Sequence, residues 1–401
     1  MSSGERPSML RHMLLGTVLV IGLGSTNVDA AATDASALVK AGEQLLEKND
    51  IKGADTQFQQ AIRQAPNDPA LRIHLARIYL KQNNLHAAEA ELTLVRQKRL
   101  LADKSDYTNV ELSEQMDATL AEVLYKEGES VSLLREVPAG NRAPKLESIV
   151  RTYRGLSEFR LEQRRNAETM LKDAERLDPM SIPAKIGTAL FLFSGGDSMA
   201  AERKIDDVLM AAPHNSDAIG LKGSIALAAG RTDEALARFN DALKEDPKNG
   251  DALVSRARLY LAKGDLNHAS DDVKLMQQLD TTRWMSIYLH ASIAARQKDY
   301  KAADDALAKF RPAMDRMPES YLLAGIVKYY LNQFGQADEY LTRYIAHDKG
   351  RAQAYQFLGA VALKQGNPKR AVQMLDQANK LAPENKDIVR LLDEAKKASN
   401  G

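Results

Sequence analysis

Hydrophobic positions along the chain form pairs of helical faces that recur with a period of 34 residues. In residues 216–249, one apolar face predicts a first helix that runs through Leu227, and another predicts a second helix over 234–244. The polar segment 230–233 between them predicts a turn, and Pro247 ends the second helix because proline cannot continue it. The pattern therefore predicts a repeated helix–turn–helix unit, and no period alternates like a strand.

Two sets of small residues keep the same period. One set consists of alanines that are 34 residues apart except for one interval of 79, at positions 54, 88, 167, 201, 235, 269, 303, 337 and 371. The other set is always glycine or alanine and lies twelve residues earlier in the period, at 42, 76, 121, 155, 189, 223, 257, 291, 325 and 359. Small side chains let two helix axes approach closely, so we expect both sets where the two helices of each unit cross.

The unit resembles the tetratricopeptide repeat in its length of 34 residues, its small residues at places eight and twenty, and its proline at place thirty-two. Counted from starts at 35, 69, 114, 148, 182, 216, 250, 284, 318 and 352, the chain contains ten copies. In the sixth copy the pattern stands as Gly223, Ala235, Phe239, Ala242 and Pro247. The resemblance implies an all-α, right-handed superhelical solenoid of about ten units and about twenty repeat helices.

Some units depart from the pattern. Trp284, the only tryptophan, opens the eighth unit. Met276, Phe310 and Tyr344 take place twenty-seven of the seventh, eighth and ninth units, where a small residue is common. These departures loosen the match to the repeat pattern locally, but they do not change the register.

The break in the period marks an irregular region between the second and fourth units. Eleven residues, 103–113, are inserted before the third unit, and Leu133 takes its alanine place. Pro138 and Pro144 follow in the segment expected for its second helix, so we expect this helix to end near Glu136. We interpret the region as a joint between two blocks of repeats; the alternative is a tolerated surface insertion.

The amino-terminal residues have the pattern of a secretory signal peptide. Arg6, Arg11 and His12 precede an uncharged apolar run over 13–23, and small residues around Ala30 fit a cleavage site. The run of eleven is shorter than the roughly 20 apolar residues that a membrane-spanning helix needs. We therefore expect cleavage after Ala30 and an exported, periplasmic protein; the alternative is an uncleaved signal anchor.

The carboxyl-terminal residues predict a capping helix over 384–397, followed by a frayed tail from Ser399. One face of this helix is apolar and would cover the core of the last unit, through Ile388, Leu391, Leu392 and Ala395. The predicted organisation is a signal peptide (1–30), units one and two (31–102), the insertion and degenerate third unit (103–147), units four to ten (148–385), and the capping helix and tail (386–401).

Composition and motifs exclude several classes of function. With 55 basic and 54 acidic residues the chain has no large positive field, so nucleic acid is not an expected partner. The sequence has no metalloprotease, phosphate-loop or nucleophile-elbow motif, and its seven histidines lack metal-ligand spacing. We expect no enzyme activity, no cofactor and no metal. The absence of cysteine excludes a lipid-bearing cysteine, so any membrane attachment would need a partner or an uncleaved signal segment.

The repeat resemblance also implies where a partner would bind. In tetratricopeptide proteins, places two, five, nine, twelve and thirteen of the first helices tend to point into a concave groove. Carried onto this sequence, these places give ten candidate binding residues: Phe159, Arg160, Phe193, Arg258, Tyr288, Arg296, Leu322, Ile326, Tyr329 and Tyr330. Aromatic residues and arginines concentrate interface energy, which favours a peptide ligand, although the rings could equally stack on sugars. The alternative is that each side chain packs on the next repeat.

Beyond the generic repeat, the layout resembles the tetratricopeptide lipoprotein of the exosortase (PEP-CTERM) exopolysaccharide system of Gram-negative bacteria. The resemblance rests on the signal segment, the irregular third unit, and the repeat segments 75–80, 87–92 and 335–341. The lipid-bearing cysteine of that family is missing, and the chain matches only the amino-terminal half of its longer members. The resemblance implies an exported scaffold for protein–protein interactions in envelope or exopolysaccharide assembly and secretion. A periplasmic chaperone or polysaccharide-binding module is the alternative.

Overall fold

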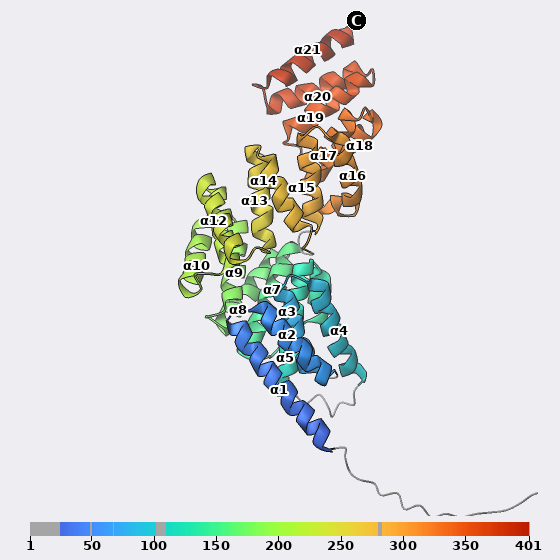
Figure 1. The fold of residues 1–401 in the computed structure, drawn as a ribbon. Helices are drawn as coiled ribbons and strands as arrows, with labels where there is room; N and C mark the ends of the chain where they lie inside the picture. Colours follow the sequence, from blue (N-terminus) through green and yellow to red (C-terminus); the bar gives the residue numbers. More distant parts are fainter. Residues whose placement is uncertain (1–24, 49, 67, 102–109, 280–282, 401) are drawn as a thin grey trace, which may run out of the picture. The chain divides into compact units, whose positions relative to one another are not determined.

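The computed structural model describes residues 25–48, 50–66, 68–101, 110–279 and 283–400. These residues form 21 α-helices and one 3₁₀-helix, and no strand occurs among them, as the periodicity predicted (Figure 1). The chain divides into two compact units, Met1–Leu75 and Ala76–Gly401. No helix in the described ranges is both long enough and apolar enough to cross a bilayer.

The first compact unit contains α1 (Ser25–Glu47), α2 (Ile51–Gln64) and the start of α3 (Pro69–Lys81). Ala54 and Phe58 of α2 are fully buried. Phe58 lies against Gly42, where an added Cβ would come within 2.8 Å of its ring. The predicted cleavage site after Ala30 falls within α1, whereas the apolar run 13–23 lies outside the described residues.

The second compact unit carries the remaining repeat helices, in which odd-numbered helices are the first and even-numbered helices the second of each repeat. The helices are α4 (Leu85–Leu101), α5 (Val110–Glu127), α6 (Ser130–Glu136), α7 (Pro144–Arg160), α8 (Arg164–Leu177), α9 (Ile182–Ser194), α10 (Ser198–Ala211), α11 (Ser216–Ala228), α12 (Thr232–Glu245), α13 (Gly250–Lys263), α14 (Leu266–Met276), α15 (Arg283–Arg296), α16 (Tyr300–Phe310), the 3₁₀-helix η2 (Arg311–Arg316), α17 (Glu319–Tyr330), α18 (Phe334–His347), α19 (Ala352–Lys364), α20 (Pro368–Leu381) and α21 (Lys386–Asn400).

The small residues lie at the helix crossings, as predicted. All nine alanines at place twenty are fully buried. The glycines at place eight face a large residue sixteen positions later, on the second helix of the same repeat. At Gly223 an added Cβ would lie 2.8 Å from Phe239, and at Gly325 it would lie 2.5 Å from Leu341. The fixed spacing of small and large residues thus sets how closely the two helices of a repeat approach.

Two of the three second helices with a large residue at place twenty-seven are shorter than the second helices of most other repeats. In the fourth, fifth, sixth and tenth repeats the second helix has 14 residues. In the seventh and eighth, α14 and α16 have 11 residues and end at Met276 and Phe310. Tyr344 does not shorten α18, which keeps 14 residues. The repeat register is retained throughout, as the sequence predicted.

The irregular third repeat confirms one prediction and refines another. Helix α6 has only seven residues and ends at Glu136, as predicted. Pro144 does not lie inside that helix. It occupies the first turn of α7, where proline is tolerated because the backbone N–H has no helical partner there. Helix α5 begins at Val110, four residues before the predicted start of its repeat.

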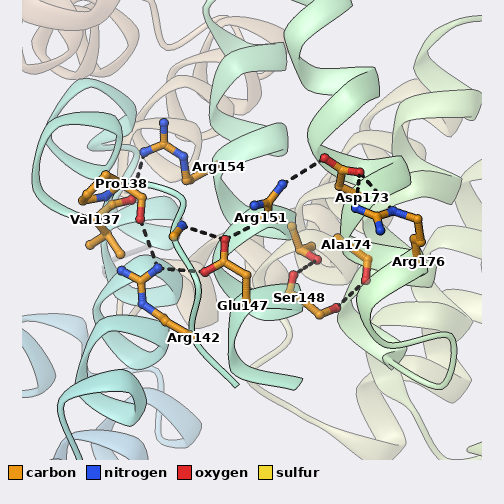
Figure 2. Close-up of polar contacts among 12 residues, drawn as sticks. Val137, Pro138, Arg142, Glu147, Ser148, Arg151, Arg154, Asp173, Ala174 and Arg176 are labelled. Atoms are coloured by element: carbon orange, nitrogen blue, oxygen red, sulfur yellow. Dashed lines mark hydrogen bonds and ion pairs between the residues drawn. The ribbon is translucent and has the colours of Figure 1, made fainter. Parts of the chain in front are cut away.

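A network of buried charges fixes this joint (Figure 2). Glu147 lies between two arginines and accepts hydrogen bonds from Arg142 Nη1 and Arg151 Nε, each at 2.8 Å. Arg142 also donates to Asp117 Oδ2 through Nη2 at 2.8 Å, and Arg151 Nη1 donates to Asp173 Oδ2 at 2.9 Å. Burial alone would lower the pKa of Arg142, but its bonds to the two carboxylates outweigh this and raise it. The network ties α5 and α8 to α7.

The last helix covers the core of the tenth repeat, as predicted. Ile388 and Ala395 of α21 are fully buried, and the helix packs on α19 and α20. It continues to Asn400, so the predicted frayed tail is wrong for Ser399 and Asn400, which are helical.

Candidate functional site

The ten predicted binding residues lie on α7, α9, α13, α15 and α17, but they are not equally accessible. Arg160, Arg258, Arg296 and Tyr330 are exposed, and Leu322 is only 9% exposed and belongs to the core. The other five are half-buried: Phe159, Phe193, Tyr288, Ile326 and Tyr329. Leu322 therefore has little surface to offer a partner.

The predicted aromatic residues near the carboxyl-terminal end of α17 form a cluster with other rings. We call Tyr300, Tyr329, Tyr330, Phe334 and Phe357 the aromatic cluster. Tyr330 stacks on Tyr300 with ring centroids 4.4 Å apart, and Tyr329 meets Phe357 edge-on at 5.4 Å. Tyr330 keeps 47% of its surface exposed. The cluster links the eighth, ninth and tenth repeats, so packing accounts for much of Tyr329 and for one ring face of Tyr330.

The predicted aromatic residues of the fourth, fifth and eighth repeats also contact neighbouring side chains. Phe159 meets Phe191 edge-on at 5.4 Å, and Tyr288 lies 5.8 Å from Phe310. Phe193 packs against the core of the fifth repeat. These rings are anchored in the solenoid rather than free on its surface.

A second group of side chains, most of which the sequence did not predict, lies on the first helices of the third, fourth, sixth and seventh repeats. We call it the tyrosine–acid cluster and define it as Glu122, Tyr125, Lys126, Tyr153, Arg160, Asp217 and Asp251. These residues come from α5, α7, α11 and α13. All except Tyr153 occupy places two, nine, twelve or thirteen, the same places that gave the predicted residues. The same places therefore point to these residues too, in the third and sixth repeats and at place two of the seventh.

Short contacts hold the α5 and α7 side of the tyrosine–acid cluster together. The rings of Tyr125 and Tyr153 lie 5.4 Å apart. The Arg160 guanidinium lies 3.8 Å from the centroid of the Tyr125 ring, and its Nη1 donates a hydrogen bond of 2.6 Å to the Tyr125 carbonyl. Lys126 Nζ pairs with Glu122 at 3.2 Å. Because Arg142 and Glu147 fix α5 against α7, the joint network also fixes these contacts.

Aspartates supply the side of the tyrosine–acid cluster on α11 and α13. Asp217 accepts a hydrogen bond of 2.8 Å from the side-chain amide of Asn249. Burial alone would lower the pKa of Lys126, but Glu122, Asp217 and Asp251 outweigh this effect and raise it. Burial raises the pKa of Tyr153 well above its ordinary value, with Glu122 and Asp217 adding to the rise. These mutual effects place the carboxylates of α11 and α13 within electrostatic reach of the tyrosines and Lys126.

The surroundings of Asp217 disfavour its charge. Its surface is exposed, yet the neighbouring helices displace enough water to raise its pKa. Lys126 opposes this rise, whereas Asp251 and Glu122 add to it. The tyrosine–acid cluster is therefore short of positive charge.

Two other features lie outside this cluster. A cavity of about 360 Å³ opens between α16, η2, α17 and α18, beside the ion pair of Lys328 and Asp304. His86, Glu89 and Glu127 bring possible metal-ligand atoms within 4.8 Å of one another, but no second feature there points to an ion.

Comparison with known families identifies the repeats. Models of the tetratricopeptide repeat match residues 45–102, 226–271 and 322–386. The matches lie in the first and second, sixth and seventh, and ninth and tenth repeats. These three ranges are therefore tetratricopeptide repeats, and proteins built from such repeats serve as scaffolds that bind peptide or protein partners. A comparison with curated proteins found no match.

Solved structures of the same class resemble the chain at low identity. A tetratricopeptide repeat protein from Parabacteroides merdae is 19% identical with a TM-score of 0.41, over 63% of this chain and 99% of its own. PilW, a type IV pilus biogenesis factor, is 20% identical with a TM-score of 0.44, over 52% of this chain and 96% of PilW. Yeast Tom70 is 14% identical with a TM-score of 0.41, over 93% and 91%. These likenesses concern the fold alone.

Proposed function

We propose that this chain is an exported, non-enzymatic scaffold that binds a segment of a partner protein on the first helices of its third to seventh repeats. The observation that carries this proposal is the tyrosine–acid cluster. Side chains of α5 and α7 contact one another, with Arg160 Nη1 2.6 Å from the Tyr125 carbonyl oxygen, and the aspartates of α11 and α13 act electrostatically on Lys126 of this group. Tyrosine and arginine are the residue types that most often dominate binding energy at interfaces.

Site-specific photocrosslinking in living cells tests the binding face. A photoreactive phenylalanine analogue would replace Lys126 or Arg160 of the tyrosine–acid cluster, or, as controls, Arg165 or Lys172 on α8. We expect one and the same protein to be captured from both first-helix positions and from neither control position, with mass spectrometry mapping the crosslinked segment. Capture from the α8 positions alone, or no product from either first-helix position, would refute the proposed face.

We further propose that the scaffold works in the cell envelope, in exopolysaccharide assembly or secretion. The signal pattern and the layout of the repeats support this placement. Amino-terminal sequencing of the protein from a periplasmic fraction should give a mature chain that begins near Ala31. Recovery of Met1 from soluble cytoplasm would contradict export.

Polysaccharide binding is the second candidate function, and the aromatic cluster is the observation that favours it. Tyr330 presents an exposed aromatic surface beside Tyr300. Trp284, the only tryptophan, lies on α15 of the same region and meets Phe310 edge-on at 6.2 Å. A polysaccharide that binds there should change the fluorescence of Trp284, and Tyr330→Ala should abolish the change. Unchanged fluorescence at saturating sugar would exclude this candidate.

A further inference from the structure

The charges of the tyrosine–acid cluster do not balance. Its cations are already engaged, since Lys126 pairs with Glu122 and Arg160 lies over the ring of Tyr125. Asp217 and Asp251 remain, and within the described part of the chain neither belongs to an ion pair. Asp217 accepts from the neutral amide of Asn249. The chain as a whole has a net charge of only +1, so the excess of carboxylates is local.

The electrostatics of neighbouring groups follow this local imbalance. The largest cause of the raised pKa of Asp217 is the loss of surrounding water. The carboxylates of Asp251, Glu122 and Asp246 raise this pKa further, and Lys126 opposes the rise. Carboxylates that repel one another in a region partly shielded from water have a lower energy once a cation lies between them. A positively charged group of a partner would supply that cation.

The aromatic side chains support a cation rather than a sugar at this cluster. The face of a tyrosine ring attracts ammonium and guanidinium groups, and Arg160 already makes such a contact with Tyr125 at 3.8 Å. Tyr153 is only 9% exposed, so it cannot offer an open ring face for a sugar to stack on. An acidic segment would meet Asp217 and Asp251 with like charge.

We propose that the partner segment bound at the tyrosine–acid cluster is basic, with lysine or arginine side chains that pair with Asp217 and Asp251. This inference rests on the proposed function and specifies the chemistry of the partner. Both aspartates occupy place two of their repeats, one residue inside the first helix, where a carboxylate also stabilises the helix amino terminus. Asn249, two residues before Asp251, donates a hydrogen bond of 2.8 Å to Asp217, so the starts of α11 and α13 are neighbours and a segment that crosses both would meet two carboxylates.

Fluorescence anisotropy with two synthetic peptides tests the proposal on the full chain. The probes are a short labelled peptide with lysine at every third position and a peptide with glutamate at the same positions. We expect the lysine peptide to bind at least about tenfold more tightly, a difference of about 1.4 kcal/mol. The double variant Asp217→Asn with Asp251→Asn should bind the lysine peptide about tenfold or more less tightly than the original protein does. Asparagine keeps an acceptor for Asn249, so the fold should be retained, as circular dichroism would show.

The matched control is Asp241→Asn with Asp271→Asn, which removes the same charge from the second helices of the same two repeats. These side chains are 58% and 67% exposed. The control should change the affinity by less than about twofold, because its aspartates lie on the second helices and not at the cluster. If the attraction were nonspecific, the affinity would fall equally in both variants. Equal loss in both variants, equal binding of the two peptides, or preference for the glutamate peptide would overturn the proposal. If photocrosslinking at Lys126 and Arg160 succeeds while these titrations fail, the binding face stands and only the basic partner is wrong.

Discussion

At the scale of single residues, the turn between the two helices of a repeat has one fixed requirement. The backbone at place fifteen is left-handed in the second to tenth repeats, with φ between 56° and 90°. Five repeats meet this requirement with glycine, which adopts the conformation without steric cost. The other four have a side chain there: Asn83, Glu162, Lys298 and Asn332. The repeat therefore retains its turn even where the favoured residue is missing.

Adding one methyl group at a helix crossing should be costly. In Gly325→Ala the new Cβ would lie 2.5 Å from Leu341 Cγ, so the helices must shift or Leu341 must leave its rotamer. We expect a loss of about 1–3 kcal/mol in the free energy of unfolding, measured by urea denaturation. Gly335→Ala is the control in the same repeat, because nothing lies within 4 Å of its Cβ. It should be neutral or slightly stabilising, and equal losses in both variants would contradict this account of the crossing.

A second prediction at this scale concerns pH and Asp217. Its raised pKa means that Asp217 takes up a proton at a higher pH than an ordinary aspartate does. Since only the carboxylate attracts a cation, affinity for the lysine peptide should be constant near neutral pH and fall as the pH drops toward that raised pKa. Anisotropy titrations between about pH 7 and about pH 4 would measure this, with Asp217→Asn as the comparison. An identical pH profile in the variant would show that Asp217 is not the titrating group.

At the scale of elements, the joint shows how an irregular repeat is held in place. Its second helix has only seven residues, so it cannot bury the usual apolar face against α7. Charged side chains supply the missing contacts instead: Arg142 and Glu147 connect α5, the segment 137–143 and α7. The sequence predicted the shortened helix from Pro138, but not this network, since ion-pair partners far apart in sequence have no local pattern.

Removing the central carboxylate of the joint should destabilise the protein strongly. Glu147→Ala leaves the half-buried guanidinium groups of Arg142 and Arg151 without their shared partner. We expect the free energy of unfolding to fall by about 3–5 kcal/mol, measured by thermal or urea unfolding. Glu168→Ala removes an exposed glutamate that pairs with Lys172 at 2.7 Å, and it should have little measurable effect. A small loss for Glu147→Ala would mean that the network does not hold the joint.

The two neighbouring tyrosines of α17 should behave differently when truncated. Tyr329 is half-buried among Tyr330, Phe334 and Phe357, so Tyr329→Ala should open a cavity and cost about 3 kcal/mol. Tyr330 is 47% exposed, so Tyr330→Ala should lower the free energy of unfolding by less than about 1 kcal/mol. Melting temperatures of the two single variants measure this difference. Equal shifts would mean that both rings serve the core.

At the scale of the whole molecule, periodicity carries the fold and only part of the site. Small residues at fixed places predicted the helix pairs, and their burial at the crossings confirms them. The same places were a guide to the binding face, but Leu322 shows that a predicted place can lie in the core. Conversely, Asp217 and Asp251 gain their interest only from the folded arrangement, in which both raise the pKa of Lys126 on a helix far away in the sequence. That meeting depends on how successive repeats turn, which no single repeat encodes.

Hydrogen–deuterium exchange on the full chain, with and without the partner segment identified by photocrosslinking, tests the central claim most directly. The amides at the end of α5, around Tyr125, and at the starts of α11 and α13 lie in terminal helical turns, where exchange is fast enough to follow. If the tyrosine–acid cluster binds the partner, exchange should slow at these three places and stay unchanged in α8 and α12. Protection confined to the second helices, or to the aromatic cluster around Tyr330, would contradict the proposal.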